Sequence, residues 1–380
     1  MALDPGYRAA FADWLACACG GWQERAALAA WEADPSTLGR IAAVGAAGHA
    51  LDFDDTYAPG LAHCTAPVAP AALVIVAGRA SGASMGDVLG AYARGFEATA
   101  TLARASHPEL YRRGWHPTAV CGAVGSAIAC SILLWLDEEQ TRTAVRLALL
   151  QASGLRGAFG TDGKALQVGF AAAAGARAAM LADEGAAATA DVILGFEEAY
   201  GATWAEPDPA RPAIRENWIK AYPCCLQTHS AIEGADHVRR EGFEGGPVRV
   251  RLHPVSLQAA PHVNPVTSLE AKFSIPYTVA FTLLHGPPRV ADFSALREDA
   301  LKVASGIEVE PDGLLAESAA VLEMEGESIA VEAALGSPQR PMTEEQLSAK
   351  IHSLTPLPVE ELVRDDTPAA DVLRAIRAVS

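Results

Sequence analysis

Apolar residues in the first half of the chain recur at the spacing of an amphipathic helix. Between Tyr7 and Gly20 the apolar side chains fall three or four positions apart, and Gly20-Gly21 ends the pattern. Further helices are predicted over residues 42–51, 70–80, 85–105, 118–136, 143–152 and 165–182. Because Ala and Gly are abundant in these segments and aromatic residues are few, we expect closely packed helices.

The pattern changes after residue 222, where period-two alternation appears for the first time. Strands are predicted over residues 248–252, 320–324 and 329–333. Helical spacing returns over residues 268–284 and 343–380, the latter with a break at 355–358. The second half therefore combines a small sheet with helices.

A chain of 380 residues exceeds the size at which single cores stop growing, so we expect two domains. We predict a mainly α protein with a large all-helical domain made of residues 1–221 and 341–380. A smaller α+β lid domain, residues 222–340, is inserted before the C-terminal helices.

The formal net charge of -17 excludes classes of partner that require a positive surface. Nucleic acids and anionic membranes both attract basic faces, so we expect neither as a partner. Residues 118–136 are uncharged over the length of a membrane span, but glycines and serines dilute the segment, and we predict a buried helix of a soluble protein. An anionic substrate would need local lysines and histidines.

The cysteines and the N-terminus favour a cytoplasmic location. Seven cysteines show no regular spacing, which fits a reducing compartment better than a disulfide framework. The adjacent Cys224 and Cys225, without a second pair, make a weak zinc motif. The first residues contain an early acid and no basic region, so no signal peptide is evident.

Residues 218–229 hold the densest group of reactive side chains, around Pro223. They are Lys220, Tyr222, Cys224, Cys225 and His229. Each alone could be a packing or surface residue. Similar groups recur at 52–63, His116, Lys164 and Tyr277, so we predict that one pocket collects them.

Three acids, Asp52, Asp54 and Asp55, follow the helix predicted over residues 42–51. They do not begin a calcium loop, because residues 57–60 break the ligand spacing and no Glu closes it. For Asp54 and Asp55, helix-end capping with solvation and a functional role stay open. Asp52 directly follows apolar residues of the predicted helix, so we expect its carboxylate in the interior, where it needs a hydrogen-bonding or charged partner.

His63 and His116 each stand just ahead of a predicted helix, where unpaired N–H groups attract anions. Lys164 opens the helix predicted over residues 165–182, and we interpret it as an anion contact rather than a surface charge. The glycine-rich loop before it lacks the Gly-Lys-Ser/Thr ending of a phosphate loop. A nucleotide site is therefore not predicted.

Five segments together resemble the MmgE/PrpD family, which includes 2-methylcitrate dehydratase, cis-aconitate decarboxylase and iminodisuccinate epimerase. They are residues 51–56, 114–118, 160–164, 220–225 and 272–277, and they occur in order over most of the chain. The resemblance implies a helical domain with an α+β lid, a homodimer, and a site that uses neither metal nor cofactor. The implied substrate is a small anionic carboxylate.

The resemblance also implies the site residues. Catalytic roles would fall on His116, Asp52, Lys220, Tyr277 and Cys225, and substrate binding on His63, Lys164 and Thr56. We add Gln167 and His229 as further candidates for substrate binding. In this hypothesis His116, oriented by Asp52, moves a proton, while Tyr277 or Cys225 acts as the acid. Lys164, Lys220 and His63 hold the carboxylates.

Two departures from the family pattern bear on the reaction. Cys225 and Gln167 stand where the decarboxylase has histidines, which argues against decarboxylation of cis-aconitate. We predict a hydro-lyase resembling 2-methylcitrate dehydratase, with a two-base epimerase of a dicarboxylate as the alternative. A cis-aconitate-type decarboxylase and a non-catalytic helical binding protein are the remaining alternatives.

Overall fold

The computed structural model describes residues 3–78, 82–324 and 326–378, and the chain divides into two compact units. Unit 1 consists of Met1–Ala158, Asp162–Ile219 and Thr343–Ser380, and unit 2 of Phe159–Thr161 and Lys220–Met342. With 59% of residues in helices and 9% in strands, the mainly α prediction is confirmed.

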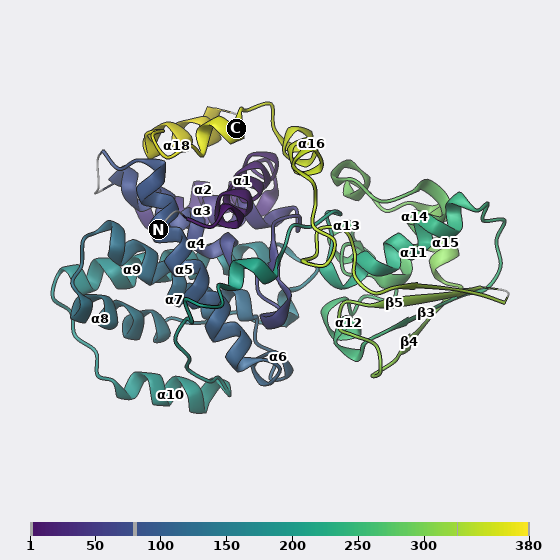
Figure 1. Ribbon diagram of the computed structural model, residues 1–380, viewed down its shortest axis with the longest axis horizontal. Helices are drawn as coiled ribbons and strands as arrows, with labels where there is room; N and C mark the ends of the chain where they lie inside the picture. The colour runs from purple at the N-terminus through teal and green to yellow at the C-terminus, as the bar shows by residue number, and fades with distance from the viewer. Residues whose placement is uncertain (1–2, 79–81, 325, 379–380) are drawn as a thin grey trace. The chain divides into compact units, whose positions relative to one another are not determined.

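Unit 1 is built from helices of the N-terminal two hundred residues and of the C-terminal segment (Figure 1). The first group is α1 (Pro5–Gly20), α2 (Arg25–Ala33), α3 (Thr37–Ala50), α4 (Thr65–Gly78), α5 (Met85–Ser106), α6 (Glu109–Arg112), α7 (Pro117–Leu133), α8 (Glu138–Leu149), α9 (Asp162–Asp183) and α10 (Asp191–Tyr200). The second is α16 (Glu344–Leu354), α17 (Val359–Leu362) and α18 (Ala369–Ala378).

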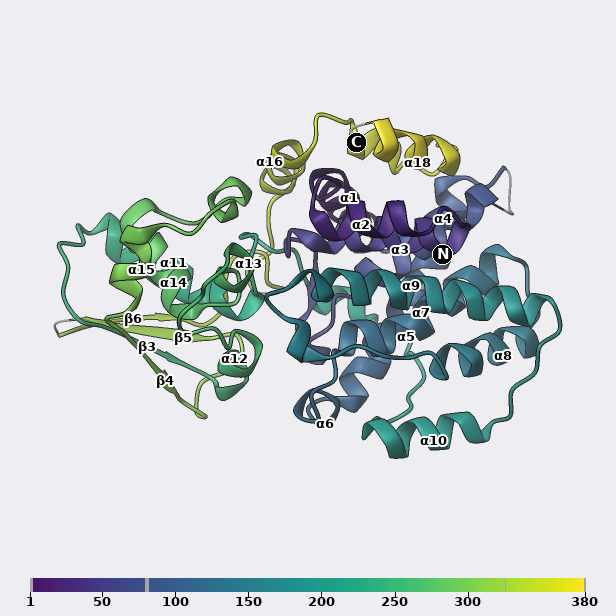
Figure 2. The ribbon, with the colours of Figure 1, turned by 180° about the vertical axis from the view of Figure 1, so that it is seen from behind.

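Helix α7 lies at the centre of unit 1 and packs against α4, α5, α8 and α9; Figure 2 shows α5, α7 and α9 together. The close approach of α5 and α7 depends on glycine, because a Cβ on Gly95 would lie 2.4 Å from the carbonyl oxygen of Gly125. The small residues of the sequence therefore allow helix backbones to touch. The prediction of a buried helix for the uncharged segment is confirmed by α7.

Among the described residues, α9 is the one helix long and apolar enough to cross a membrane, and 67% of that stretch is buried inside the protein. Its apolar residues are therefore mostly explained by packing against α3, α7 and α8.

The C-terminal helices return to the N-terminal ones. Helix α16 packs on α1 and helix α18 on α4 and α1, as the yellow and purple ribbons show in both views (Figures 1 and 2). Lys350 of α16 is buried and forms an ion pair of 2.6 Å with Asp13 of α1. The same ammonium donates a hydrogen bond of 2.7 Å to the Phe53 carbonyl, so the returning segment supports the loop after α3.

Unit 1 is not wholly helical, which corrects the prediction of an all-helical domain. Strands β1 (Thr56–Tyr57) and β2 (Asn217–Trp218) form an antiparallel ladder of two residues each. The period-two signal of such short strands is too brief to be read from sequence. The ladder places Thr56 and Asn217 beside the acidic loop.

Unit 2 contains a four-stranded sheet in the order β4-β3-β5-β6. Its strands are β3 (Val248–Leu252), β4 (Ile307–Pro311), β5 (Ala320–Met324) and β6 (Glu327–Val331). β3 pairs parallel with β4 and antiparallel with β5, and β5–β6 is antiparallel. β3 and β5 match the predicted ranges, β6 starts two residues early, and the edge strand β4 was not predicted.

Helices α11 (His229–Arg240), α14 (Ile275–His285) and α15 (Glu298–Ala304) pack together beside this sheet, and the shorter α12 (Pro254–Ala259) and α13 (Ser268–Ala271) precede α14. The helix predicted over residues 268–284 is in fact α13 and α14. Ser274 caps α14 by accepting from the N–H of Tyr277, and Pro276 occupies its first turn, where a missing N–H costs nothing.

Candidate active site

The predicted site residues fall into two groups, one in each unit. Unit 1 holds Asp52, Thr56, His63, His116, Lys164 and Gln167, and unit 2 holds Lys220, Cys225, His229 and Tyr277. The single pocket that would collect both groups stays a prediction.

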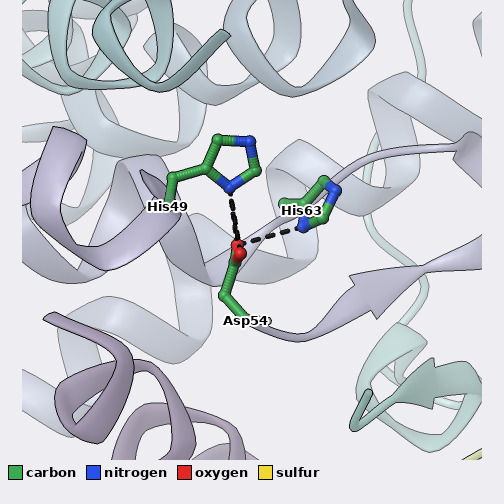
Figure 3. Close-up of side chains that lie close together, drawn as sticks. All are labelled: His49, Asp54 and His63. Carbon is green, nitrogen blue, oxygen red and sulfur yellow. Dashed lines mark hydrogen bonds and ion pairs between the residues drawn. The ribbon is translucent and has the colours of Figure 1, made fainter. Parts of the chain in front are cut away.

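In unit 1, the Asp54 carboxylate joins two histidines. Its Oδ2 lies 2.8 Å from Nδ1 of His49, in the last turn of α3, and 3.0 Å from Nδ1 of His63, just ahead of α4. Figure 3 shows the carboxylate between the two rings, which meet edge to face with centroids 4.5 Å apart. Burial alone would raise the pKa of Asp54, but the two imidazoles together hold it well below its usual range.

A carboxylate with so low a pKa is ionised and can only accept hydrogen bonds, which assigns the protons of both rings. His49 and His63 each carry a hydrogen on Nδ1 and donate it to Asp54. In the neutral ring the other nitrogen, Nε2, then carries a lone pair. His63 is therefore arranged as a proton acceptor backed by a buried carboxylate.

The hydrogen-bonded chain continues from His49 to Lys164, near the start of α9. The Lys164 ammonium donates to Nε2 of His49 at 2.7 Å and to Oδ1 of Asp52 at 2.6 Å. Burial lowers the pKa of His49; the charge of Asp54 opposes this shift, and the charge of Lys164 adds to it. His49 is therefore a neutral link between an anion and a cation, rather than a second proton carrier.

Asp52 lies in the interior beside a cation, as predicted. Its backbone adopts the left-handed conformation with φ 53, which Asp tolerates better than most residues, and its N–H bonds to the carbonyl of His49. This turn separates Asp52 from Asp54 so that the two carboxylates bind different partners. Lys350 stabilises this turn by donating a hydrogen bond to the carbonyl of Phe53.

His49, Asp54 and His63 each contribute one nitrogen or oxygen atom to a group whose members lie within 4.8 Å of one another. A metal ion could also be bound at this spacing. The Nδ1–Oδ2 distances of 2.8 and 3.0 Å are those of direct N–H···O hydrogen bonds, so protons account for the arrangement. In the structure these residues therefore form a hydrogen-bonded group.

His116 occupies the N-cap position of α7 and has a different partner. Its Nδ1 lies 2.7 Å from the Nε2 amide nitrogen of Gln167 in α9, and its ring stacks against that of His49 at 6.3 Å. Burial and then the charge of Lys164 lower the pKa of His116 well below its usual value. His116 is therefore neutral at physiological pH.

Backbone contacts hold His116 and His63 in place. The N–H of His116 bonds to the carbonyl of Gly154 at 3.0 Å, and the N–H of His63 bonds to Oγ1 of Thr118 at 3.0 Å. Thr118 follows His116 by two residues in α7, so the same helix end positions both rings. The Thr56 hydroxyl lies 3.4 Å from Nδ1 of His63.

Asp54 and Asp55 are completely buried, which decides the open question of whether they are solvated. Oδ2 of Asp55 accepts from Thr65 and Asn217, each at 2.8 Å. Burial, then the negative charge of Asp54, raises the pKa of Asp55 to about 8. Neighbouring carboxyls in the chain thus have opposite protonation at neutral pH.

Replacing Asp55 with asparagine should stabilise the protein increasingly as the pH rises. An unfolded Asp releases its proton near pH 4, whereas the folded one keeps it up to about pH 8. The wild type therefore loses stability across this interval, and Asn, which mimics the neutral acid, does not. We expect the difference in free energy of unfolding between Asp55→Asn and the wild type to increase, in favour of the variant, by roughly 1 kcal/mol per pH unit between pH 5 and 7. Urea unfolding at pH 5, 6 and 7 measures this, and a constant difference would contradict the assignment.

In unit 2, two of the predicted groups contact the backbone carbonyl of Cys224. The Lys220 ammonium, which is buried, donates to this carbonyl at 3.0 Å, and Nε2 of His229 lies 3.3 Å from it. Cys225 donates through its thiol to the Ala259 carbonyl at 3.7 Å. The Tyr277 hydroxyl oxygen accepts from the N–H of Arg297 at 3.1 Å, and burial raises the pKa of this phenol.

Sequence reasoning missed His49 and left Asp54 unassigned. His49 follows Gly45, Ala46, Ala47 and Gly48 in a helix of small residues. An imidazole next to so many small residues was a signal that the side chain is buried and has a polar partner. Gln167 was predicted to bind substrate, but its amide is hydrogen-bonded to His116 and to the backbone of Leu155.

These features define a mainly α protein with a buried imidazole–carboxylate–ammonium site in its larger unit. The sequence matches the MmgE/PrpD N-terminal domain over residues 41–211 and the MmgE/PrpD C-terminal domain over residues 222–367. The chain belongs to the MmgE/PrpD family, as the resemblance predicted.

Similar proteins of known activity are cis-aconitate decarboxylases. The human enzyme is 30% identical over 71% of this chain, and the Aspergillus terreus enzyme 28% identical over 74%. A cis-aconitate decarboxylase-like protein of Aspergillus oryzae is 27% identical over 76%. The matched region spans 61% of the length of the human relative and 68% of that of the A. terreus relative.

Proposed function

We propose that this protein is a lyase that acts on a small di- or tricarboxylate by proton transfer at a carbon next to a carboxylate, with elimination of water as its reaction. The observation that carries the proposal is the His63–Asp54 pair, a proton acceptor backed by a buried, ionised carboxylate. The family membership of the chain supports the choice of a lyase.

In this proposal His63 is the base. Its Nε2 takes the proton from the carbon, and the electron pair of that C–H bond forms a carbon–carbon double bond as the neighbouring C–O bond breaks. The departing hydroxide takes the proton from His63 and leaves as water. When its Nε2 accepts a proton the ring becomes cationic, and the Asp54 carboxylate 3.0 Å from Nδ1 stabilises that charge. Asp54 itself stays ionised, because its pKa is held low. The chain from Asp54 through His49 to Lys164 keeps the carboxylate in place during the transfer.

His116 has a different role, which revises the hypothesis that it moves the proton. A neutral imidazole with a low pKa is a poor proton carrier but a good hydrogen-bond donor. Removing a proton next to a carboxylate places negative charge on the carboxylate oxygens, and an N–H directed at them lowers the barrier. We assign this stabilising role to His116.

A second candidate reaction, decarboxylation, is favoured by the names of the relatives. It would use the same two groups, with protonated His63 delivering a proton to the carbanion that remains after carbon dioxide leaves. The two-base epimerisation predicted as the alternative needs two proton carriers. In the described part of unit 1, only His63 is arranged as one.

Incubating the protein with 2-methylcitrate and cis-aconitate, and following the products by mass spectrometry and proton NMR, tests the proposal. Loss or gain of water is the expected result. Loss of carbon dioxide would replace it with the second candidate, and a change in optical rotation at constant mass would indicate the epimerase. No turnover of any carboxylate tested would contradict the proposal.

A further inference from the structure

We infer that Gln167 is a positioning residue that fixes the tautomer of His116, so that Nε2 of this imidazole carries the hydrogen and acts as a donor. The inference deepens the proposed function and rests on it for the chemical role of His116. The tautomer itself rests only on hydrogen bonds within unit 1.

The orientation of the Gln167 amide follows from the backbone of Leu155. The Leu155 N–H can only donate, and it lies 2.8 Å from Oε1 of Gln167. On the other side, the amide nitrogen Nε2 of Gln167 lies 3.3 Å from the carbonyl of Leu155, which can only accept. Reversing the amide would place oxygen against oxygen and N–H against N–H, so the backbone fixes its direction.

This orientation leaves the Gln167 amide nitrogen facing Nδ1 of His116 at 2.7 Å. An NH₂ group has no lone pair to offer, so Nδ1 of His116 must be the acceptor. In a neutral imidazole the hydrogen then lies on Nε2. His116 therefore carries its hydrogen on Nε2, because the Gln167 amide donates to its Nδ1. His63 carries its hydrogen on Nδ1, because the Asp54 carboxylate accepts from that atom.

The charged groups around His116 keep the ring neutral. Lys164 from α9, His49 from α3 and His63 ahead of α4 each disfavour its protonation, and Asp52 opposes them. A carboxylate in place of the Gln167 amide could only accept a hydrogen bond, so Nδ1 of His116 would have to be the donor. His116 would then hold a hydrogen on Nδ1, and its pKa would rise.

The test uses Gln167→Glu, with Gln140→Glu as its control. Gln140 is the third residue of α8, where its side chain completes a capping box that Glu also forms, so the control makes the same charge change without loss of the cap. Proton–nitrogen correlation NMR on protein labelled with ¹⁵N-histidine reads the tautomer without substrate, and His116→Phe identifies the signal.

We expect the His116 signal of the wild type to show a hydrogen on Nε2 only, and that of Gln167→Glu to show one on Nδ1. In kinetics, Gln167→Glu should lose kcat as the pH rises through the new pKa of His116, by about 10²-fold at the alkaline end, because Nε2 then loses its hydrogen. The wild type and Gln140→Glu should lack this decline, with KM little changed.

A hydrogen on Nδ1 of His116 in the wild type would overturn the inference, whatever reaction the protein catalyses. An unchanged pH profile in Gln167→Glu with an altered tautomer would overturn the role of His116 in the reaction. Failure to find a carboxylate substrate would contradict the proposed function and leave the NMR test in force.

Discussion

Replacing Asp54 with asparagine should lower kcat by about 10³- to 10⁴-fold while the protein stays folded. The Asn amide keeps the shape of the carboxylate but can donate, so it no longer requires Nδ1 of His63 to carry the hydrogen. It also removes the negative charge that stabilises the protonated ring. In serine proteases, the equivalent change behind the catalytic histidine has an effect of about 10⁴-fold.

The adjacent Asp55 provides the control for this prediction. Asp55→Asn changes the same atoms one residue away, but the Asp55 carboxyl is neutral at pH 7 because its pKa is about 8. We expect Asp55→Asn to keep kcat within a few-fold of the wild type. Equal losses in the two variants, measured as initial rates at pH 7, would mean that the acidic loop is needed only for its fold.

Replacing Lys350 with methionine should lower the free energy of unfolding by about 3–5 kcal/mol, because it leaves a buried carboxylate without its cation. The side chains of Lys350 and Asp13 are 4% and 0% exposed, and their charged atoms lie 2.6 Å apart. The variant also removes the donor to the Phe53 carbonyl. Activity should therefore fall together with stability, because the Asp52–Asp54 turn loses its support.

Denaturant unfolding of Lys350→Met measures the loss, and two further variants interpret it. Adding Asp13→Leu should recover most of the stability, because two apolar side chains can replace a buried ion pair. Arg374→Met breaks an ion pair with Asp371 on the exposed face of α18, and we expect it to cost less than about 1 kcal/mol. A similar small cost for Lys350→Met would show that the Lys350–Asp13 pair does not hold the C-terminal helices.

The helical architecture could be predicted from sequence because most of its segments repeat one pattern over many turns. Residues 85–105 and 165–182 were predicted as helices and lie within α5 and α9. Short elements were harder to predict. β4 has only two apolar residues in its alternation, and β1 and β2 are two residues each, so their pairing depends on tertiary contacts that periodicity does not encode.

The candidate site was predictable as a set of residue types but not as a set of contacts. Asp52 was expected in the interior and is buried, whereas His63, His116 and Lys164 were singled out for their places just ahead of or at the start of helices, and all three are buried as well. The partner of His116 at Nδ1 could not be foreseen, since Gln167 lies 51 positions away in the chain. For Asp54 the sequence left solvation and a functional role open, because a run of carboxyls gives no sign of which one receives cationic partners.

The structure also shows binding partners that differ from those expected from the sequence. Lys164 was expected to bind a substrate anion, and in the structure its ammonium contacts Asp52 and His49. The homodimer, the cytoplasmic location and the roles of Lys220, Cys225, His229 and Tyr277 stay predictions. The hydrogen bonds described for the last four join them to residues of unit 2.

Deuterium exchange from solvent tests the central claim, that His63, supported by the Asp54 carboxylate, transfers a proton at a carbon next to a carboxylate. The wild type, Asp55→Asn and Asp54→Asn would each be brought to equilibrium with the carboxylate that is turned over, in deuterated water, and NMR would locate the deuterium. We predict deuterium at that carbon with the wild type and Asp55→Asn, and almost none over the same time with Asp54→Asn. Turnover by the wild type without deuterium at that carbon, or undiminished exchange with Asp54→Asn, would contradict the account.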